Sequence, residues 1–486
     1  MSERTLEGPG VCAEDIRAEH GLVGMAVAVI DPGGVLIECA GAASIGGGPV
    51  GADTVFRIAS VTKTMTAIGV MQLQDEARLS LDDAVNRHIS GLVIDPPAGA
   101  PPVTFKHLLT HTAGIGEIPS WRLAVRPQAW GYAQPGSAGV DLARLYHGRL
   151  RTEVPAGVKW AYANHGFAVL GRAIEDVTQS PLADRMHRRL FGPLGMTSTS
   201  YLRSAALEQS MATGHVTRRG RIRPVKDYDR SLLGAGAVRS TITDMARYVR
   251  ALLAGGELDG QRVLAASTLQ QMFSQHYTPD GRVGGMGLGF VTRVLAGHRV
   301  VGHDGNLPGF ASAIRIAPDD DLGVVVLTNT ATMFGAHVIA ETVLRDRLRI
   351  PAPSMTPAHP SEATAGRYGL PSGVLTNFRT RLMLGTRIEV VTQAAPTLRT
   401  MGIDAALRRG LPLQRGSLTP TPMVSLHGLD IPVAFTSQPP ALVIGYPILA
   451  RLNQRRPPTS RRNATSATAG ACAAACRRFA RRLKRR

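Results

Sequence analysis

The 486-residue sequence has few cysteines and no long apolar run. Its four cysteines show neither metal-ligand spacing nor a dense disulfide framework, which fits a reducing compartment. No apolar stretch approaches the roughly 20 residues that a membrane-spanning helix needs. The first residues, MSERTLEGPGVCAEDIRAEH, contain no apolar core of a signal peptide. We therefore expect a cytoplasmic protein without a transmembrane segment.

Lysine is scarce, although the formal net charge is +19. The five lysines are at positions 63, 106, 159, 226 and 484, and none begins a Lys-Thr-Gly triplet. Residues 451–486 hold 12 of the basic residues and no acidic residue, which leaves 43 basic and 36 acidic residues elsewhere. Because the positive charge is concentrated in this tail, we expect no nucleic-acid partner for the folded part of the chain.

Two common hydrolase motifs are also absent. We find no Gly-x-Ser-x-Gly, the nucleophile motif of α/β-hydrolases. His107 and His111 have the i, i+4 spacing of a zinc helix, but HLLTH lacks the internal glutamate and an evident third ligand. The sequence therefore predicts no metal site and no cofactor, and a metallohydrolase is a disfavoured alternative.

The order of sequence patterns predicts an α+β protein. GMAVAVIDPGGVLIECAG is typical of a hairpin, and residues 287–329 are typical of strands joined by turns, with helical patterns between these two regions. We expect one antiparallel sheet built from both regions, with helices packed on it. The predicted division is a domain over 1–350, a Pro-rich linker over 351–361, a small all-β C-terminal domain over 362–455 and a basic disordered tail over 456–486.

Ser60 and Lys63 begin an apolar run in FRIASVTKTMTAIGVMQLQD. Residues i and i+3 share a helix face, so the Lys63 amine would lie beside the Ser60 hydroxyl. Burial near a helix N-terminus lowers the pKa of a lysine, so that a neutral amine can accept the serine proton. Alternatively, Ser60 is a helix N-cap and Lys63 a solvated charge.

Two further segments supply candidate partners for this pair. Tyr162 and Asn164 alternate in an extended segment and would face the same side, unless Asn164 N-caps the following helix and Tyr162 packs beneath it. His303 and Gly305 lie on a glycine-rich strand, where the backbone amide of Asn306, with that of Ser60, could donate to a developing oxyanion. The alternative for His303 is a surface turn.

These motifs, in this order, resemble the class C β-lactamase-like serine hydrolases, which include penicillin-binding proteins, D-aminopeptidases and esterases. The resemblance covers about residues 24–329 and rests on DTVFRIASVTKT, LSLDDAV, LLTHTAGI, YAN, GAGAVRSTITDMARYV and GHDGNLPGF. It implies a β-lactamase/transpeptidase-like fold with Ser60 as the acylated nucleophile and with Lys63 and Tyr162 sharing the proton transfers. It also implies that Asn164 holds substrate or Lys63, and that His303 and Gly305 line the far side of the cleft.

Many β-lactamases and penicillin-binding proteins have Lys-Thr-Gly as the third motif, and its cation attracts a substrate carboxylate. This chain lacks that lysine, and His303 is at most partly charged near neutral pH. We therefore predict weak recognition of an anionic β-lactam. We therefore expect an esterase that acts on a small-molecule acyl substrate. The alternatives are a β-lactamase or D-amino-acid peptidase, and an inactive ligand-binding homologue. Three tryptophans could line an apolar acyl pocket or pack in the core: Trp121, Trp130 and Trp160.

The basic tail allows two interpretations. Its composition predicts disorder and no effect on the folded enzyme. A helix there would align Cys472, Cys476, Phe479 and Leu483 on one apolar stripe amid arginines. That pattern is typical of a weak contact with an anionic membrane surface.

Overall fold

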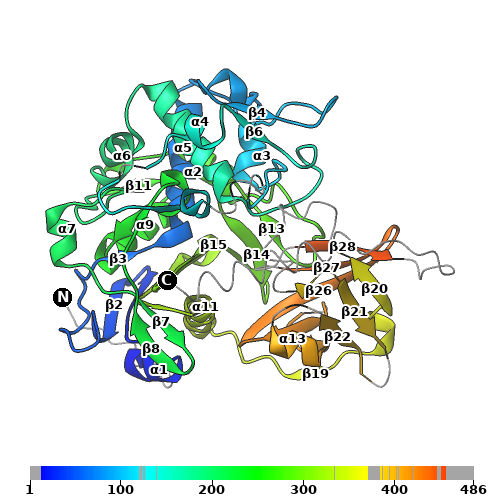
Figure 1. Cartoon of the computed structure of the whole chain (residues 1–486). Helices are drawn as coiled ribbons and strands as arrows, with labels where there is room; N and C mark the ends of the chain where they lie inside the picture. The colour runs from blue at the N-terminus through cyan, green and yellow to red at the C-terminus, as the bar shows by residue number, and fades with distance from the viewer. Residues whose placement is uncertain are drawn as a thin grey trace.

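The computed structural model describes residues 12–455, except positions 119, 121–122, 124–125, 138, 333, 370–383, 386, 393–394, 401, 403, 420 and 446–449. Figure 1 shows a large region of helices around a sheet, and beside it a smaller region built mostly of strands. The basic tail lies outside the described residues. Among the residues that are described, no helix has the length and apolar character needed to cross a membrane.

The large region is organised around a seven-stranded antiparallel sheet in the order β13-β14-β15-β16-β17-β1-β2. Its strands are β1 (Gly24–Asp31), β2 (Gly34–Gly41), β13 (Gly285–Met286), β14 (Val291–Leu295), β15 (His298–Leu307), β16 (Phe310–Ala317) and β17 (Leu322–Thr328). Strand β1 pairs with β17, so strands from the two ends of this region are neighbours within one sheet. The prediction of one antiparallel sheet assembled from distant segments is confirmed.

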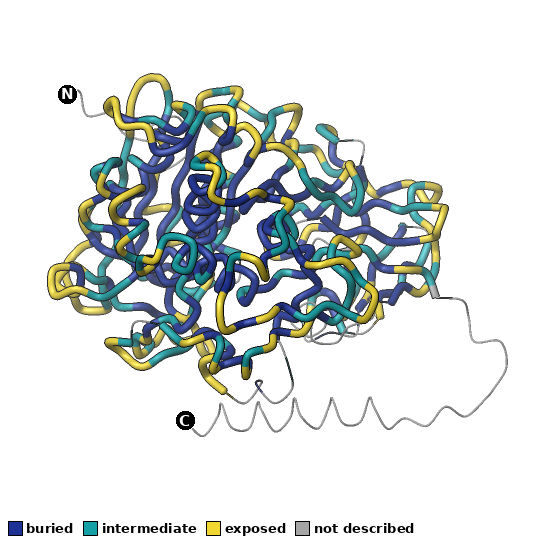
Figure 2. The backbone as a smooth tube through the Cα atoms, turned by 90° about the horizontal axis from the view of Figure 1, so that it is seen from above, coloured by how far each residue is buried: buried dark blue, intermediate teal, exposed yellow. Residues whose placement is uncertain are grey.

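Alternating side chains of the central strands feed two separate cores. Along β1, Met25, Val27 and Val29 pack on the face covered by α1 and α11, whereas Ala26 and Ala28 face the helices of the opposite layer. Both faces are therefore buried, which explains why β1 is apolar at nearly every position. Figure 2 shows this buried backbone in the interior of the molecule, with exposed residues along the outer turns.

Eleven helices belong to this region of the described chain. They are α1 (Ala13–Glu19), α2 (Thr62–Asp75), α3 (Phe105–Leu109), α4 (Leu142–Leu145), α5 (Asn164–Thr178), α6 (Leu182–Met186), α7 (Ala205–Gln209), α8 (Leu233–Gly236), α9 (Ile242–Leu253), α10 (Ala266–Phe273) and α11 (Gly335–Arg347). Short strands between them are β3 (Phe56–Arg57), β4 (Val93–Asp95), β5 (Tyr132–Ala133), β6 (Arg149–Arg151), β7 (His215–Arg218), β8 (Arg221–Pro224), β9 (Asp229–Arg230), β10 (Arg239–Ser240), β11 (Glu257–Leu258), β12 (Gln261–Arg262) and β18 (Thr330–Ala331).

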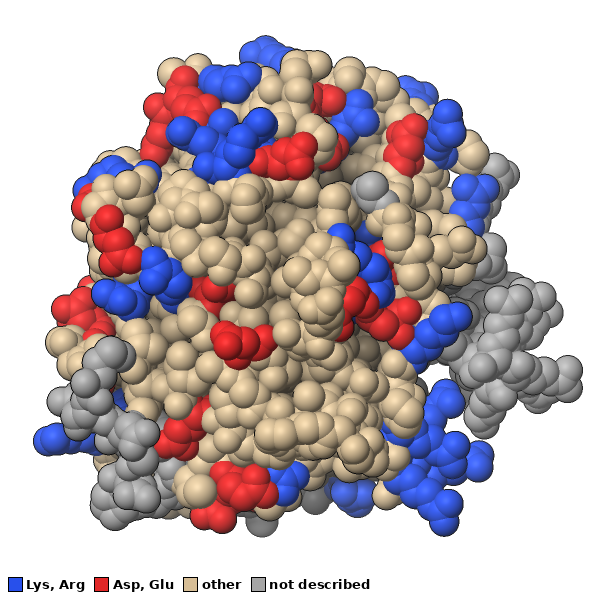
Figure 3. Space-filling view, turned by 90° about the vertical axis from the view of Figure 1, so that its left-hand side faces the viewer, with Lys and Arg blue, Asp and Glu red and all other residues tan. Residues whose placement is uncertain are grey.

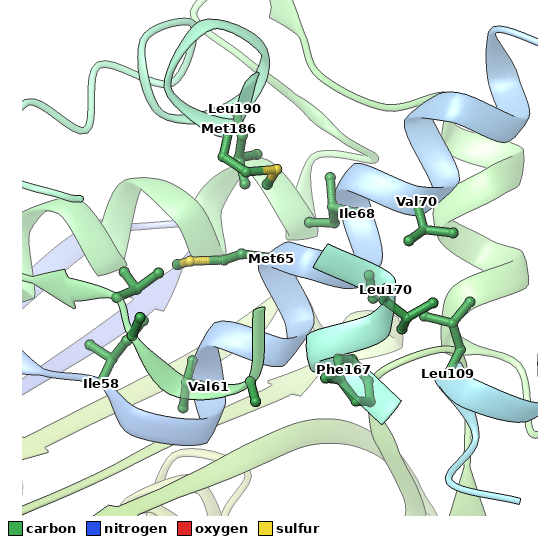
Figure 4. Packing of buried hydrophobic residues seen from close by; sticks show 14 of the residues in the cluster. Ile58, Val61, Met65, Ile68, Val70, Leu109, Phe167, Leu170, Met186 and Leu190 are labelled. Carbon is green, nitrogen blue, oxygen red and sulfur yellow. The ribbon is translucent and has the colours of Figure 1, made fainter. Parts of the chain in front are cut away.

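Helix α2 is the central helix of the large region. Every residue from Thr62 to Leu73 is buried, in agreement with the apolar run that follows Lys63. In Figure 4 its apolar side chains meet Phe167 and Leu170 of α5 and Met186 of α6. This enclosure holds the start of α2 in one place relative to α5 and the sheet.

The C-terminal region is a nearly closed, mostly β structure. Its sheet has ten strands in the order β19-β24-β25-β26-β27-β28-β20-β21-β22-β23. The strands are β19 (Met355–Pro357), β20 (Gly366–Gly369), β21 (Arg387–Val391), β22 (Thr397–Thr400), β23 (Leu411–Pro412), β24 (Gln414–Gly416), β25 (Met423–Leu426), β26 (Leu429–Ser437), β27 (Pro440–Ile444) and β28 (Ala450–Arg455), accompanied by helix α13 (Ala405–Arg409). The small all-β domain predicted from the sequence is present.

One detail differs from the predicted linker over 351–361. Strand β19 lies within that Pro-rich segment and pairs with β24, so that Met355 is opposite Gly416. Proline is tolerated at the edge of a sheet, where a missing amide breaks no ladder bond. The C-terminal sheet therefore begins before residue 362, and the other domain boundaries stay predictions.

Candidate active site

Ser60 lies in a 3-10 turn over Ala59–Val61, immediately before α2. Ala59 has a φ of 49°, in the left-handed region that a residue with a Cβ seldom adopts. Such backbone conformations are often found at functional sites, where the surrounding structure holds them. The turn places Ser60 one step outside the helix, and no side-chain cap is made at this helix start. The alternative of Ser60 as a simple N-cap is therefore wrong.

Lys63 is fully buried and lies on the same side as Ser60. Its Nζ donates to Ser60 Oγ at 3.0 Å, to Asn164 Oδ1 at 2.8 Å and to the carbonyl oxygen of Ala235 at 2.6 Å. The Nζ also lies 4.9 Å from the centre of the Tyr162 ring. A solvated surface lysine is thus excluded, and the amine is fixed beside the serine hydroxyl as its spacing predicted.

Tyr162 and Asn164 reach the same serine and lysine from the start of α5. The Tyr162 hydroxyl donates to Ser60 Oγ at 2.8 Å. Asn164 is the first residue of α5, whose N-cap is Ala163, and its side-chain oxygen accepts from Lys63. The capping alternative for Asn164 is therefore wrong, and both side chains face one site.

Aromatic rings back the Tyr162 side chain. The His111 ring lies 4.4 Å from the Tyr162 ring, and the Trp160 ring lies 6.2 Å from it. Trp130 belongs to a turn in which its carbonyl oxygen accepts from Arg230, and Trp121 lies outside the described residues. Of the three tryptophans, Trp160 is the one that this structure places beside Tyr162.

Strand β15 brings His303 and Gly305 to the other side of Ser60. A Cβ at Gly305 would lie 2.3 Å from both the Ile58 carbonyl oxygen and Ser312 Oγ, so only glycine lets this strand pack against the Ser60 turn. His303 is 3% exposed, and its ring lies 6.4 Å from that of Tyr162. Its burial excludes the alternative of a surface turn histidine.

His303 is neutral near neutral pH, and its tautomer is fixed. Burial, with a contribution from nearby Lys63, lowers the pKa of His303 to about 4. Its Nδ1 lies 2.7 Å from the Asp304 carbonyl oxygen, and a carbonyl can only accept. The proton is therefore on Nδ1, and Nε2 of the neutral ring is a hydrogen-bond acceptor.

Asn306 has its side chain on the opposite face of β15, where Nδ2 donates to the Thr332 carbonyl oxygen at 2.8 Å. Its backbone behaves differently. Leu307 and Phe310 are the last pair of a hairpin with a two-residue turn. Because hydrogen-bonded pairs alternate with non-hydrogen-bonded pairs along antiparallel strands, the next hydrogen-bonded pair is Gly305 with Ser312. The amide of Asn306 then points away from β16, toward the open edge of β15.

A cluster of charges behind β15 was not foreseen from the sequence. Asp304 is ion-paired with Arg315, whose Nη2 lies 2.7 Å from its Oδ1, and its Oδ2 accepts from His337 of α11 at 2.6 Å. The second ring nitrogen of His337 lies 3.4 Å from Glu341, which is also paired with Arg293 at 2.7 Å. Burial opposes the charge of Glu341, but Arg293, His337 and Arg315 outweigh it and hold the pKa of Glu341 well below its usual range.

The two histidines of HLLTH have separate roles in the structure. Helix α3 ends at Leu109, so the i, i+4 spacing of His107 and His111 does not place them on one helix face. His107 Nδ1 accepts from the Thr104 amide, and His111 Nδ1 accepts from the Ala163 amide. Within the described residues no three His, Cys, Asp or Glu side chains are grouped as metal ligands.

The fold and this arrangement around Ser60 define a serine hydrolase of the β-lactamase and transpeptidase type. The family model described as Beta-lactamase matches residues 12–348, and the chain belongs to this family. Penicillin-binding protein 4 of Amycolatopsis lactamdurans is 31% identical over 71% of this chain and 91% of its own length. The D-alanyl-D-alanine-carboxypeptidase/endopeptidase AmpH of Escherichia coli K12 is 26% identical over 66% of this chain and 84% of its own length.

A solved structure extends the likeness to the C-terminal region. The octameric penicillin-binding protein homologue from Pyrococcus abyssi matches with a TM-score of 0.58 and 21% identity. The match covers 90% of this chain and 97% of the homologue, so both regions share its fold.

Proposed function

We propose that the protein is an esterase that cleaves small or medium acyl esters through an acyl-enzyme on Ser60. The observation that carries this proposal is the neutral, Nδ1-protonated His303 on the strand facing Ser60. A fixed cation at this position would attract a substrate carboxylate, whereas a neutral acceptor offers no such attraction. Uncharged acyl esters therefore suit this site better than anionic β-lactams.

The proposed reaction begins with attack of Ser60 Oγ on the ester carbonyl carbon. The hydroxyl proton passes to the Lys63–Tyr162 pair, which accepts it with the Lys63 amine in its neutral form. The polar atoms of this pair lie 3.0 Å and 2.8 Å from Oγ. The tetrahedral adduct collapses, the C–O bond to the alcohol breaks, and the pair returns the proton to the departing oxygen. Water then attacks the acyl-enzyme by the same proton exchange and releases the acid.

The backbone amides of Ser60 and Asn306 are the proposed donors to the developing oxyanion. Gly305 supports this role, because it lets β15 approach the Ser60 turn without a side chain between them. Asn164 holds the Lys63 amine in line through its side-chain oxygen. Preorganised donors of this kind contribute roughly 3–4 kcal/mol each to transition-state stabilisation.

A D-amino-acid carboxypeptidase is the second candidate. It is favoured by the likeness to AmpH of Escherichia coli and to a penicillin-binding protein. An inactive ligand-binding homologue is disfavoured by the hydrogen bonds that Lys63 and Tyr162 direct at Ser60 Oγ.

Side-by-side turnover of acetate and butyrate esters, a chromogenic cephalosporin and D-amino-acid amides tests this proposal. We expect ester turnover to exceed β-lactam turnover by at least about tenfold, or roughly 1.4 kcal/mol of transition-state stabilisation. His303→Lys is the matched variant, and it should narrow that ratio by restoring a cation. Faster cleavage of the cephalosporin than of either ester by the wild-type enzyme would reverse the ranking, and preferred cleavage of the amides would favour the peptidase.

A further inference from the structure

His111 is a buried histidine that the proposed reaction does not use. It follows the end of α3, has a φ of 58°, and is 3% exposed. Its ring lies 4.4 Å from the Tyr162 ring at an interplanar angle of 35°, and 5.1 Å from the ring of Phe167 on α5. The His111 ring therefore packs against the phenol ring of Tyr162.

The same side chain makes a second contact with this segment. His111 Nδ1 accepts from the Ala163 amide at 3.2 Å. Ala163 separates Tyr162 from Asn164 and is the N-cap of α5, with no side-chain cap of its own. His111 thus supplies, from another part of the chain, an acceptor for an amide at the helix start.

The hydrogen bond from the Ala163 amide requires an uncharged ring. A protonated Nδ1 could not accept from the Ala163 amide, so the single proton of the neutral ring is on Nε2. Burial, together with the nearby Lys63 and His303, holds the pKa of His111 well below its ordinary value. The imidazole therefore stays neutral across the pH range in which the enzyme is expected to work.

We propose that His111 is a positioning residue that sets the Tyr162–Ala163–Asn164 segment in register with Ser60 and Lys63. Its ring fixes the plane of Tyr162, and its Nδ1 fixes the Tyr162–Ala163 peptide, which immediately precedes the residue that leads to Asn164. One side chain thereby serves two hydrogen bonds: Tyr162 to Ser60, and Lys63 to Asn164. The inference rests on the proposed function, in which Tyr162 exchanges a proton with Ser60.

Two substitutions separate the two contacts. His111→Asn keeps a side-chain acceptor, tolerates a left-handed φ and removes the ring. His111→Phe keeps a ring and removes the acceptor. Each should lower the rate of Ser60 acylation by about tenfold to a hundredfold, since small misplacements of reacting groups have effects of this size. His215→Asn is the matched control, because His215 is also buried and hydrogen-bonded to backbone but lies on β7.

A double-mutant cycle with Tyr162→Phe distinguishes positioning from a general loss of stability. If His111 acts through Tyr162, His111→Asn should change the acylation rate by less than about twofold in the Tyr162→Phe background. Rates are divided by the fraction of Ser60 that a fluorophosphonate finally labels, so that unfolded molecules are not counted. If the effects of His111→Asn and Tyr162→Phe on the acylation rate are fully additive, His111 does not act through Tyr162. The same conclusion follows if the His111 variants lose no more activity than His215→Asn, and His111 is then an ordinary core residue.

A third measurement covers the case in which the variants do not fold. In the wild-type chain, ¹⁵N histidine spectra should contain a buried neutral ring protonated on Nε2 whose signals move when a fluorophosphonate occupies Ser60. Absence of such a ring contradicts the positioning role. Failure of the wild-type protein to be labelled at Ser60 would instead contradict the proposed function, whatever the behaviour of His111.

Discussion

The two faces of strand β15 differ in their use of charge. His303 and Gly305 face the Ser60 turn, and the one titratable group of the two is neutral. Asp304 faces α11 on the other side, where it is paired with Arg315 and His337. Neighbouring residues of one strand thus meet opposite environments, because successive side chains of a strand point to opposite faces.

The two faces of β15 therefore have different roles. The α11 face holds the strand in position, and the other face lies toward the proposed substrate site at Ser60. Ion pairs on the α11 face hold β15 from the side opposite to the Ser60 turn. In the proposed reaction, the neutral His303 on the Ser60 face leaves substrate selection by this strand to hydrogen bonds and shape. Figure 3 shows the outer surface from one side, where basic and acidic side chains are interleaved rather than gathered in a single patch.

The largest effect is expected on the Ser60 face. Ser60→Ala and Lys63→Ala should each lower kcat/KM for a butyrate ester by about a thousandfold or more, because Oγ is the attacking atom and Lys63 Nζ lies 3.0 Å from it. The double variant should be little worse than either single one, since the two groups act as a unit. Steady-state kinetics measure these changes in kcat/KM, and thermal unfolding checks that the variants are as stable as the wild-type protein.

Lys106→Ala is the control for loss of a lysine, as Lys106 lies on α3 outside the Ser60 contacts. It should retain turnover within about twofold. Near-normal ester hydrolysis by Ser60→Ala would rule out the acyl-enzyme mechanism.

On the α11 face the expected effect is on stability. Asp304→Asn removes the carboxylate that pairs with Arg315 and His337, and it leaves the Arg315 charge buried without that partner. The free energy of unfolding should fall by about 3 kcal/mol. Chemical denaturation measures the change.

Asp319→Asn is the matched control, because the Asp319–Arg299 pair is solvent-exposed. It should cost less than about 1 kcal/mol. Equal destabilisation by the two substitutions would contradict a special anchoring role for the ions behind β15.

A smaller effect is expected when the pH is lowered. Burial lowers the pKa of His165 to about 3, and burial with Lys63 lowers that of His303 to about 4. The unfolded chain, with histidine pKa values near about 6.5, therefore binds more protons than the folded chain as the pH falls from about 6.5 toward 4. Each of the two should reduce stability by about 1 kcal/mol between pH 7.5 and 5.5.

Thermal unfolding at these two pH values tests the sign of this effect. Greater stability at pH 5.5 than at pH 7.5 would contradict the conclusion that His165 and His303 are neutral in the folded protein.

The smallest effect is expected from the basic tail. Removal of residues 456–486 leaves β28 complete, since this strand ends at Arg455. Ester turnover should stay within about twofold, because the tail composition supplies almost no core. Co-sedimentation of the intact chain, but not of the shortened one, with anionic liposomes at low salt would support the membrane contact. Equal sedimentation would leave the tail as solvated charge.

The sequence predicted what is local in the chain. The i, i+3 spacing of Ser60 and Lys63, the hairpin of β1 and β2, and the strands from β14 to β17 could all be read from short patterns. Spacing alone did not assign Asn164, because an asparagine at a helix start is usually a cap, and only the family resemblance offered a contact with substrate or Lys63. The structure shows its oxygen on Lys63 instead.

Contacts between distant segments could not be predicted from the sequence, because no short pattern encodes them. The Ala235 carbonyl that accepts from Lys63 is a backbone group and leaves no signature in the sequence. The partners of Asp304 come from β16 and α11, which only the fold brings together. His111 belongs to LLTHTAGI, a motif that carried the family resemblance, yet its contact with Tyr162 depends on the left-handed turn after α3.

The most direct test of the account is to look for the acyl-enzyme itself. The intact protein is mixed with a slowly hydrolysed ester, quenched in acid, digested and analysed by mass spectrometry. We predict one acyl group on the peptide that contains Ser60, absent from Ser60→Ala and lost with time as turnover proceeds. Ester hydrolysis at the wild-type rate with no acyl group on Ser60, or with the group on another residue, would contradict the central claim.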